Sequence, residues 1–295
     1  MIDYLRMLRI KDWIKFYPLF PLAGAFLAGG GPGQTLLVLI AYICIISYAF
    51  VVNNYFDAEI DRQHRRKVES GTNPMAAGKV DERGVMLLMF ALVSISLVLS
   101  ISLDLTGALF VVINLLLLTA YSASHVRLKE RYLLDTVSHG LMFGALPFIS
   151  GFLLCGGDPS RGIILISLIF FIVGCEALIA HQIVDYAEDL GSTTTTVTRI
   201  GQKNGLLMLV GLVVLSLVFV FTAARLFQLS LAVAAASALY LMVYPTYSVR
   251  GMLNDISHRP RAERGGADRG DPEVPCMPIH GHRELRDRGS RWGLR

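Results

Sequence analysis

The chain has 295 residues, of which 54% are hydrophobic and 17% are charged, and its mean hydropathy is +0.54. A composition this apolar excludes an ordinary soluble globular domain, and the apolar residues come in runs rather than in amphipathic stripes. The formal charge of +4 is small, and the basic residues gather in a few loops, which indicates membrane topology and not nucleic-acid binding.

Runs of about 20 apolar residues predict membrane-spanning helices. Together they predict one all-α polytopic membrane domain over residues 1–250, built as a bundle of eight helices. The first run contains Pro18 and Pro21 but no small-residue cleavage site follows it, so it is interpreted as a mature helix and not as a signal peptide. The predicted spans are 13–30, 35–53, 84–103, 106–122, 134–155, 162–184, 204–224 and 228–248.

The basic residues lie mainly in the loops that follow the second, fourth and sixth predicted spans. Because Lys and Arg accumulate on the cytoplasmic side of a membrane, the amino terminus and these three loops are predicted to be cytoplasmic. The loops on the other side contain Arg161 and Arg225. The basic residues of the predicted cytoplasmic loops are Arg62, Arg65, Arg66, Lys67, Lys79 and Arg83, then Arg127, Lys129 and Arg131, then Arg199 and Lys203.

Two acidic patterns end the second and sixth predicted spans. The first contains Asp57 and Asp61 and the second contains Asp185 and Asp189. On a helix, residues four apart share one face and lie about 6 Å apart along the axis. One such pair is most simply a solvated helix end, but two pairs on the same membrane face favour a functional site, because carboxylates at this depth are costly without partners.

The chemistry of these patterns indicates a hard cation. The carbonyl groups at a helix carboxyl terminus are partially negative, so carboxylates there repel the helix end unless a cation is present. Oxygen ligands of this kind suit Mg²⁺, which is commonly held by one or two carboxylates together with substrate phosphates. The sequence therefore predicts that Asp57, Asp61, Asp185 and Asp189 bind Mg²⁺ against a diphosphate.

Basic residues after the first pattern fit a diphosphate site. Arg66, Lys67 and Lys79 can neutralise phosphate oxygens that the metal does not reach. The alternative is that these cations set the topology and bind anionic lipid headgroups, and the two roles are compatible.

These residues resemble four ordered motifs of the UbiA-type intramembrane prenyltransferases. The family's N-D-x-x-D-x-x-x-D motif matches Asn53, Asp57 and Asp61, with Asn54 where an aspartate is usual. Its R-P-x-x-x-G element matches Pro74 and Gly78, with Asn73 replacing the arginine. Its Y-S-x-P-P-x-R-x-K loop is similar to Tyr121–Lys129 without both prolines, and its D-x-x-x-D motif matches Asp185 and Asp189.

The resemblance implies a fold of about nine helices and Mg²⁺-dependent transfer of a prenyl group from an isoprenyl diphosphate to a hydrophobic or aromatic acceptor, such as a quinone precursor or a lipid. It implies that the four aspartates are catalytic metal ligands. Aromatic faces such as that of Tyr121 would stabilise positive charge on the allylic carbon, although an interfacial belt is the simpler role for them. The substrate-binding residues that it implies are Asn53, Asn54, Arg66, Lys67, Lys79, Tyr121, Arg127, Lys129 and His181.

Two histidines inside or beside the spans are further candidates. His181 lies four residues before Asp185, and His139 lies within the predicted fifth span. Either could deprotonate an acceptor. For His139 the simpler interpretation is a packed, hydrogen-bonded histidine of a helix.

Residues 251–295 are rich in Arg, Gly, Asp, Glu and Pro, which predicts a disordered cytoplasmic tail in place of a ninth helix. Two other functions are compatible with the sequence. A cation-coupled transporter would also place acidic residues in the membrane, although usually near its midplane. A catalytically impaired UbiA-like protein would keep the fold, since Asn54 and Asn73 replace charged residues of the motifs.

Overall fold

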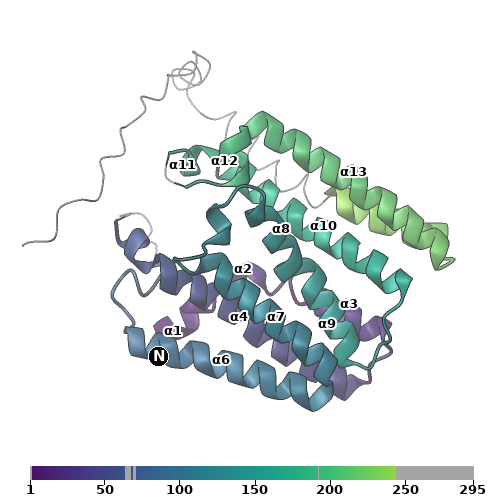
Figure 1. Ribbon diagram of the computed structural model, residues 1–295, viewed down its shortest axis with the longest axis horizontal. Helices are drawn as coiled ribbons and strands as arrows, with labels where there is room; N and C mark the ends of the chain where they lie inside the picture. Colours follow the sequence, from purple (N-terminus) through teal and green to yellow (C-terminus); the bar gives the residue numbers. More distant parts are fainter. Residues whose placement is uncertain (1, 64–67, 69–70, 192, 244–295) are drawn as a thin grey trace, which may run out of the picture. The chain divides into compact units, whose positions relative to one another are not determined.

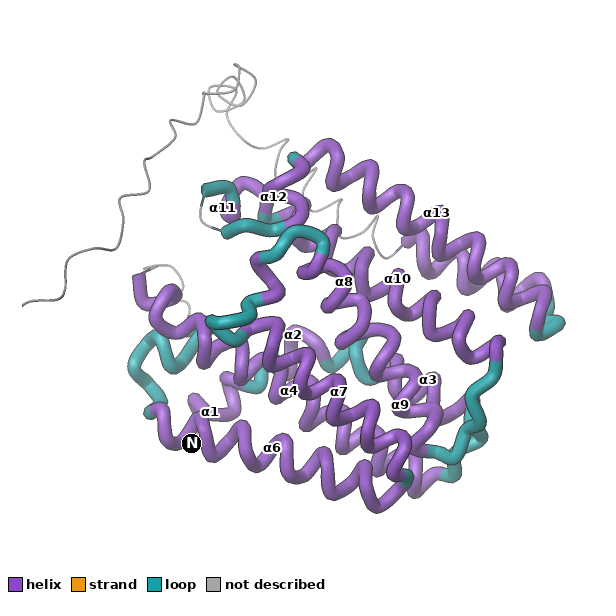
Figure 2. The backbone as a smooth tube through the Cα atoms, in the orientation of Figure 1, coloured by secondary structure: helices purple, strands orange, loops and turns teal. Residues whose placement is uncertain are grey.

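The computed structural model describes residues 2–63, 68, 71–191 and 193–243, and its regular structure in these ranges is helical throughout (Figures 1 and 2). Arg66, Lys67 and the predicted tail lie outside the described residues. The helices are α1 (Ile2–Met7), α2 (Ile10–Trp13), α3 (Leu19–Leu27), α4 (Pro32–Gln63), α6 (Glu82–Leu103), α7 (Leu105–Ser122), the 3-10 turn η1 (Leu128–Glu130), α8 (Leu134–Gly140), the π-helical turn η2 (Leu141–Ala145), α9 (Leu146–Leu154), α10 (Arg161–Val184), α11 (Tyr186–Asp189), α12 (Thr196–Ile200) and α13 (Gln202–Leu226).

Six helices of the described chain are long and apolar enough to cross a membrane. They are α4, α6, α7, the continuous helix formed by α8, η2 and α9, then α10 and α13. They correspond to the second to seventh predicted spans, so the all-α class and these six spans are confirmed. In Figure 1, α6 and α13 lie on opposite sides of this bundle.

The prediction of one continuous helix over 13–30 is wrong. Helix α2 ends at Trp13, turns follow, and α3 begins at Leu19 after Pro18. Proline has no backbone N–H and its ring clashes with a preceding helical turn, so it starts a helix more readily than it continues one. The nine residues of α3 are about 14 Å long, too short to cross a membrane alone.

The predicted eighth span, 228–248, is also shorter in the described residues. An apolar helix runs over Leu231–Val243, and residues 244–248 are not among those described. Six described spans therefore stand where eight were predicted.

Helix α4 extends beyond the apolar part of its sequence. Its 32 residues make it about 48 Å long, against about 30 Å for the hydrocarbon core of a bilayer. The last turns of α4, which contain Asp57 and Asp61, therefore continue past the apolar run of residues 35–53. Both aspartates lie on one helix, which is the condition under which residues four apart share a face.

Glycines allow two close helix crossings in the bundle. Gly140 and Gly144, in the helix of α8 and η2, pack against α10, and a Cβ added at Gly144 would overlap the carbonyl oxygen of Phe170. Gly24 of α3 lies equally close to the backbone of α9 at Phe148. Small residues at such crossings let helix backbones approach within van der Waals distance in a membrane.

Replacing Gly144 by alanine is expected to lower the stability of the bundle by about 1–3 kcal/mol, because the new methyl group must displace backbone atoms. Thermal unfolding of the purified protein in detergent measures this change. Gly211→Ala is the matched control, since a Cβ there meets no atom within 4 Å. Equal melting temperatures for the two variants would contradict a close crossing at Gly144.

Candidate active site

A cavity of about 460 Å³ lies among α2, α4, α7, α10 and the helix of α8 and η2. Its wall is mostly apolar and aromatic. Helix α4, which carries the first acidic pattern, contributes Asn53 to it, and helix α10, which the second pattern follows, contributes His181 and Val184. The residues that line it include Arg9, Asp12, Tyr17, Phe50, Asn53, Tyr121, Ser122, His139, Met142, Phe143, Leu178, His181 and Val184.

Asp57 lies one helical turn beyond Asn53, and two cations contact it. The Nζ atom of Lys129 is 2.6 Å from Asp57 Oδ1 and 2.5 Å from Oδ2, and Nη2 of Arg127 is 3.3 Å from Oδ1. Lys129 also donates to Asn53 Oδ1 at 3.0 Å. The side chains of Asp57 and Lys129 are 16% and 14% exposed, so this cluster is screened from bulk water and its charges interact strongly.

The loop after α7 positions the side chains of Arg127 and Lys129 against α4. Arg127 has a left-handed backbone conformation with φ of 45°, which reverses the chain before η1. Its Nε atom is 2.7 Å from Glu130 Oε1, so the guanidinium bridges two carboxylates. Burial lowers the pKa of Lys129, and the adjacent Asp57 carboxylate opposes that effect.

Asp61 and Asn73 form a separate, buried group. The Nδ2 atom of Asn73 donates to Asp61 Oδ2 at 3.0 Å and to the carbonyl oxygen of Asn54 at 2.8 Å. Its Oδ1 atom accepts from the backbone N–H groups of Met75 and Ala76. With both ends of its amide engaged, Asn73 ties the loop after α4 to the end of that helix, and it is 1% exposed.

Asn54 points away from the cavity. Its side chain is 3% exposed, its Nδ2 atom has no hydrogen-bond partner in the described structure, and it is not among the residues that line the cavity. Its backbone carbonyl, which accepts from Asn73, is the group that takes part in the local network.

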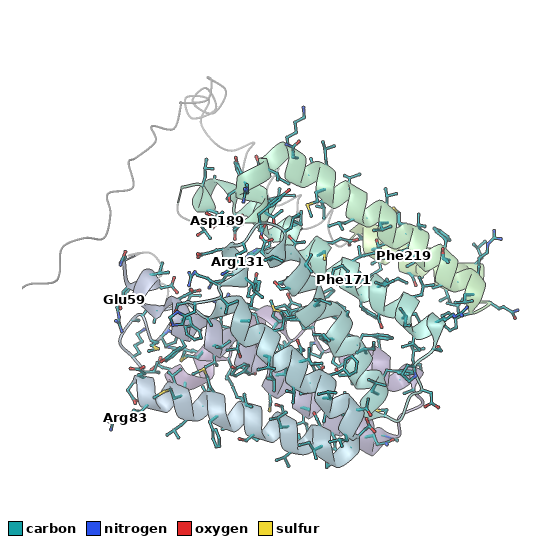
Figure 3. All side chains as sticks on the ribbon, viewed as in Figure 1. Glu59, Arg83, Arg131, Phe171, Asp189 and Phe219 are labelled. Atoms are coloured by element: carbon teal, nitrogen blue, oxygen red, sulfur yellow. The ribbon has the colours of Figure 1, made fainter. Side chains whose placement is uncertain are left out.

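The second acidic pattern lies where α10 ends. Asp185 follows the last residue of α10, and its Oδ2 atom is 3.3 Å from Nε2 of His181, which lines the cavity. The N–H of Asp189 donates to the carbonyl oxygen of Asp185 at 2.9 Å, so the two aspartates keep the spacing of one helical turn through α11. In Figure 3, Asp189 and Glu59, which lies between Asp57 and Asp61, are found toward the same end of the bundle.

The donor atoms near the cavity are oxygen atoms of the kind that Mg²⁺ prefers. Asp57, Asp185 and the amide oxygen of Asn53 all lie on or one turn from the cavity wall. In the ranges that the structure describes, no three His, Cys, Asp or Glu side chains come together as a metal site. Oxygen atoms of this kind fit a cation that is held jointly with phosphate oxygens.

The other predicted site residues are placed as follows. Tyr121 lines the cavity. Lys79 is exposed in the loop after α4, and its backbone N–H donates to the carbonyl oxygen of Pro74.

A buried carboxylate that sequence reasoning missed lies beside this site. Asp135, 0% exposed, accepts hydrogen bonds from the backbone N–H groups of Thr136 and Thr196 at 2.6 and 2.7 Å, and from Gln182 Nε2 at 2.8 Å. The hydroxyl groups of Thr136 and Thr196 also donate to it. Asp135 therefore joins α8, α10 and the start of α12, and it anchors the segment that follows the second acidic pattern.

The signal for Asp135 was present in the sequence. It is an acidic residue in the first turn of an apolar span. A carboxylate buried there has a high desolvation cost unless it has partners, which is the argument that identified the other aspartates as candidates. Its partners come from residues 47 and 61 positions away, and no local pattern connects them.

Known proteins resemble this chain in sequence. The sequence profile described as "UbiA prenyltransferase family" matches residues 18–256. A digeranylgeranylglyceryl phosphate synthase of Natronomonas pharaonis is 27% identical over 202 residues, which cover 65% of this chain and 67% of that protein. A lycopene elongase/hydratase of Haloarcula japonica is 26% identical over 207 residues, covering 68% and 67% of the two chains.

Solved structures show the same fold. A UbiA homologue of Archaeoglobus fulgidus bound to GPP and Mg²⁺ superimposes with a TM-score of 0.71 at 18% identity, covering 83% of this chain and 86% of that one. The same homologue bound to DMAPP and Mg²⁺ gives a TM-score of 0.70 at 20% identity. Because the profile matches most of the sequence, the chain belongs to the UbiA prenyltransferase family, whose members are integral membrane enzymes that transfer prenyl groups.

Proposed function

We propose that this enzyme transfers a prenyl group from an isoprenyl diphosphate to a hydrophobic or aromatic acceptor in a Mg²⁺-dependent reaction at the cytoplasmic face of the cell membrane. One observation carries the proposal. A single cavity is lined by Asn53 and by His181, and each of these residues lies one helical turn from an aspartate, Asp57 and Asp185. The cavity can therefore hold the prenyl chain while the diphosphate lies beside both acidic patterns.

The charged residues at this end of the cavity suit a diphosphate bound with metal. Asp57, Asp185 and the Asn53 amide oxygen would hold Mg²⁺, and Asp61 and Asp189 continue the same helical faces. When bound, the metal supplies Lewis-acid stabilisation of the departing diphosphate. Lys129 and Arg127, which contact Asp57, would bind phosphate oxygens, with Arg127 offering the planar donor geometry that such oxygens favour.

The wall of the cavity suits the carbon chain and the positive charge that develops on it. Tyr17, Phe50, Tyr121 and Phe143 contribute aromatic rings, which attract a cation through their faces. The apolar side chains between them limit the access of water, which competes with the acceptor for the allylic carbon.

The relatives support prenyl transfer and leave the acceptor open. Two homologous structures contain a prenyl diphosphate, GPP or DMAPP, together with Mg²⁺. The two sequence relatives carry the names of different prenyl-transferring activities, so similarity at this level does not choose between a lipid and an aromatic acceptor.

The transporter alternative has less support. The acidic residues end helices beside basic loop residues, whereas a coupling site usually lies near the middle of the bilayer. The alternative of a catalytically impaired family member keeps the same site, and an activity measurement decides it.

Removing divalent metal is expected to abolish prenyl transfer. Membranes containing the protein are incubated with radiolabelled geranyl diphosphate and a set of acceptors: a phenolic acid, an alkylglycerol phosphate and a polyprenoid. Labelled product is expected with Mg²⁺ and not with EDTA, and excess Mg²⁺ should restore it. Product formed equally under both conditions would contradict metal dependence, and no product with any acceptor would favour the impaired alternative.

A further inference from the structure

The side chain of His139 combines burial with access to the cavity. It is 7% exposed and it lines the cavity on the helix of α8 and η2. Its ring lies against Phe143, with 4.7 Å between centroids, and near Tyr121, with 6.4 Å between centroids. The ring is therefore held in one orientation by aromatic neighbours that line the same cavity.

Its hydrogen bond determines which nitrogen carries the proton. Nδ1 is 2.8 Å from the carbonyl oxygen of Gly174. A carbonyl oxygen can only accept, so Nδ1 is the protonated nitrogen and Nε2 of the neutral ring has a lone pair. No group of the described residues hydrogen-bonds Nε2. Asp135, one turn earlier on the same helix, is a carboxylate whose negative charge acts on the ring and favours an imidazolium there.

Prenyl transfer to a neutral acceptor requires such a group. The bond between C1 of the donor and the bridging oxygen breaks, and its electron pair leaves with the diphosphate. A bond then forms between C1 and an acceptor oxygen or carbon, and that atom must lose its proton. In this mostly apolar cavity, the groups that can accept this proton are a side chain with a free lone pair and the diphosphate itself.

The carboxylate and the other imidazole that line the cavity have ionic partners. Arg9 and Asp12 pair with each other at 2.7 Å, and His181 pairs with Asp185. On the basis of the proposed function, we propose that Nε2 of His139 is the general base that accepts the proton of the acceptor. The imidazolium that results returns to neutrality by passing this proton to the released diphosphate or to water as the products leave.

The simpler interpretation, that His139 is a packed helix residue, rests on the same hydrogen bond from Nδ1 to Gly174. A test must therefore remove the basic Nε2 atom while it keeps the hydrogen bond made by Nδ1. His139→Asn does so, because the amide Nδ2 of asparagine can take the place of Nδ1 and keep the bond to Gly174, while no basic atom remains at the place of Nε2. His280→Asn is the matched control, since His280 belongs to the carboxyl-terminal segment, outside the motifs and outside the residues that the structure describes.

The probe is geranyl diphosphate labelled with ¹⁸O at the bridging oxygen, with Mg²⁺ and with water as the acceptor. Scrambling of the label into non-bridging positions reports cleavage of the C1–O bond, and release of prenyl alcohol reports capture with loss of a proton. In His139→Asn, scrambling is expected within about twofold of wild type, while alcohol release falls about 100-fold or more. His280→Asn should match wild type in both rates.

Each other outcome overturns the inference in a distinguishable way. If alcohol release falls no more than scrambling in a folded His139→Asn protein, His139 is not the base. If the wild type shows no Mg²⁺-dependent scrambling, the proposed function itself fails. If the variant does not fold, ¹⁵N NMR of the histidine-labelled wild type tests the tautomer directly. The inference needs a neutral imidazole that is protonated at Nδ1 and unprotonated at Nε2, and a spectrum without such an imidazole would exclude it.

Discussion

Replacing Asp185 or Asp57 by alanine is expected to reduce prenyl transfer at least about a thousandfold, because each substitution removes an oxygen ligand at the place where charge develops on the leaving diphosphate. Asp185→Ala is the cleaner variant, since this side chain is 37% exposed and its ionic partner among the described residues is His181. Asp57→Ala also leaves Lys129 and Arg127 beside an empty position, so its effect combines lost metal binding with unpaired cations.

The measurement is the rate of Mg²⁺-dependent transfer of labelled geranyl diphosphate in membranes containing equal amounts of each protein. Asp158→Ala, in the exposed loop between α9 and α10, serves as the control and should retain wild-type activity. Titration of Mg²⁺ should show that raising the metal concentration does not rescue either variant fully. Near-normal transfer by both variants would remove these two aspartates from the site.

Replacing Asp135 by alanine is expected to lower the free energy of unfolding by about 3 kcal/mol or more, because at least three buried donors lose their acceptor at once. The N–H groups of Thr136 and Thr196 belong to the first turns of helices α8 and α12. The helix dipole additionally favours a carboxylate at such a helix amino terminus. Activity should fall as well, because the segment after Asp189 loses its anchor.

Thermal unfolding in detergent and proteolysis at residues 190–195 measure the two effects. Asp135→Asn retains one acceptor oxygen and should lose about half as much stability. A melting temperature of Asp135→Ala within error of wild type would show that the hydrogen bonds around this carboxylate contribute little to stability.

The sequence was sufficient to predict the membrane spans that consist of uninterrupted apolar runs, from α4 to α13. It failed for residues 13–30, where hydropathy predicted one helix but the proline at position 18 starts a new, short one. Hydropathy averages over a window and does not register a missing N–H group, so length and composition alone overestimated the span.

The residue types of the site could be predicted from the sequence, but the side chains that contact them could not. Asp57 and Asp61 are on one helix as the spacing required, yet Asp57 contacts Lys129 while Asp61 contacts Asn73. The replacement of a motif arginine by Asn73 indicated only a lost charge. In the structure the amide of Asn73 hydrogen-bonds the end of α4 and so connects the following loop to that helix. Contacts of this kind depend on the tertiary fold of the loop, which the spacing of residues in the sequence does not predict.

The contact between Lys129 and Asp57 affects the order in which Mg²⁺ and the diphosphate donor are expected to bind. An isolated divalent ion meets an aspartate whose charge is already balanced by a neighbouring ammonium group, so its electrostatic gain on binding is small. Pyrophosphate offers that ammonium group a new counterion at the same moment that it brings additional oxygen ligands. The resting enzyme is thus expected to have weak affinity for free magnesium, and cation and donor should bind with strong mutual cooperativity.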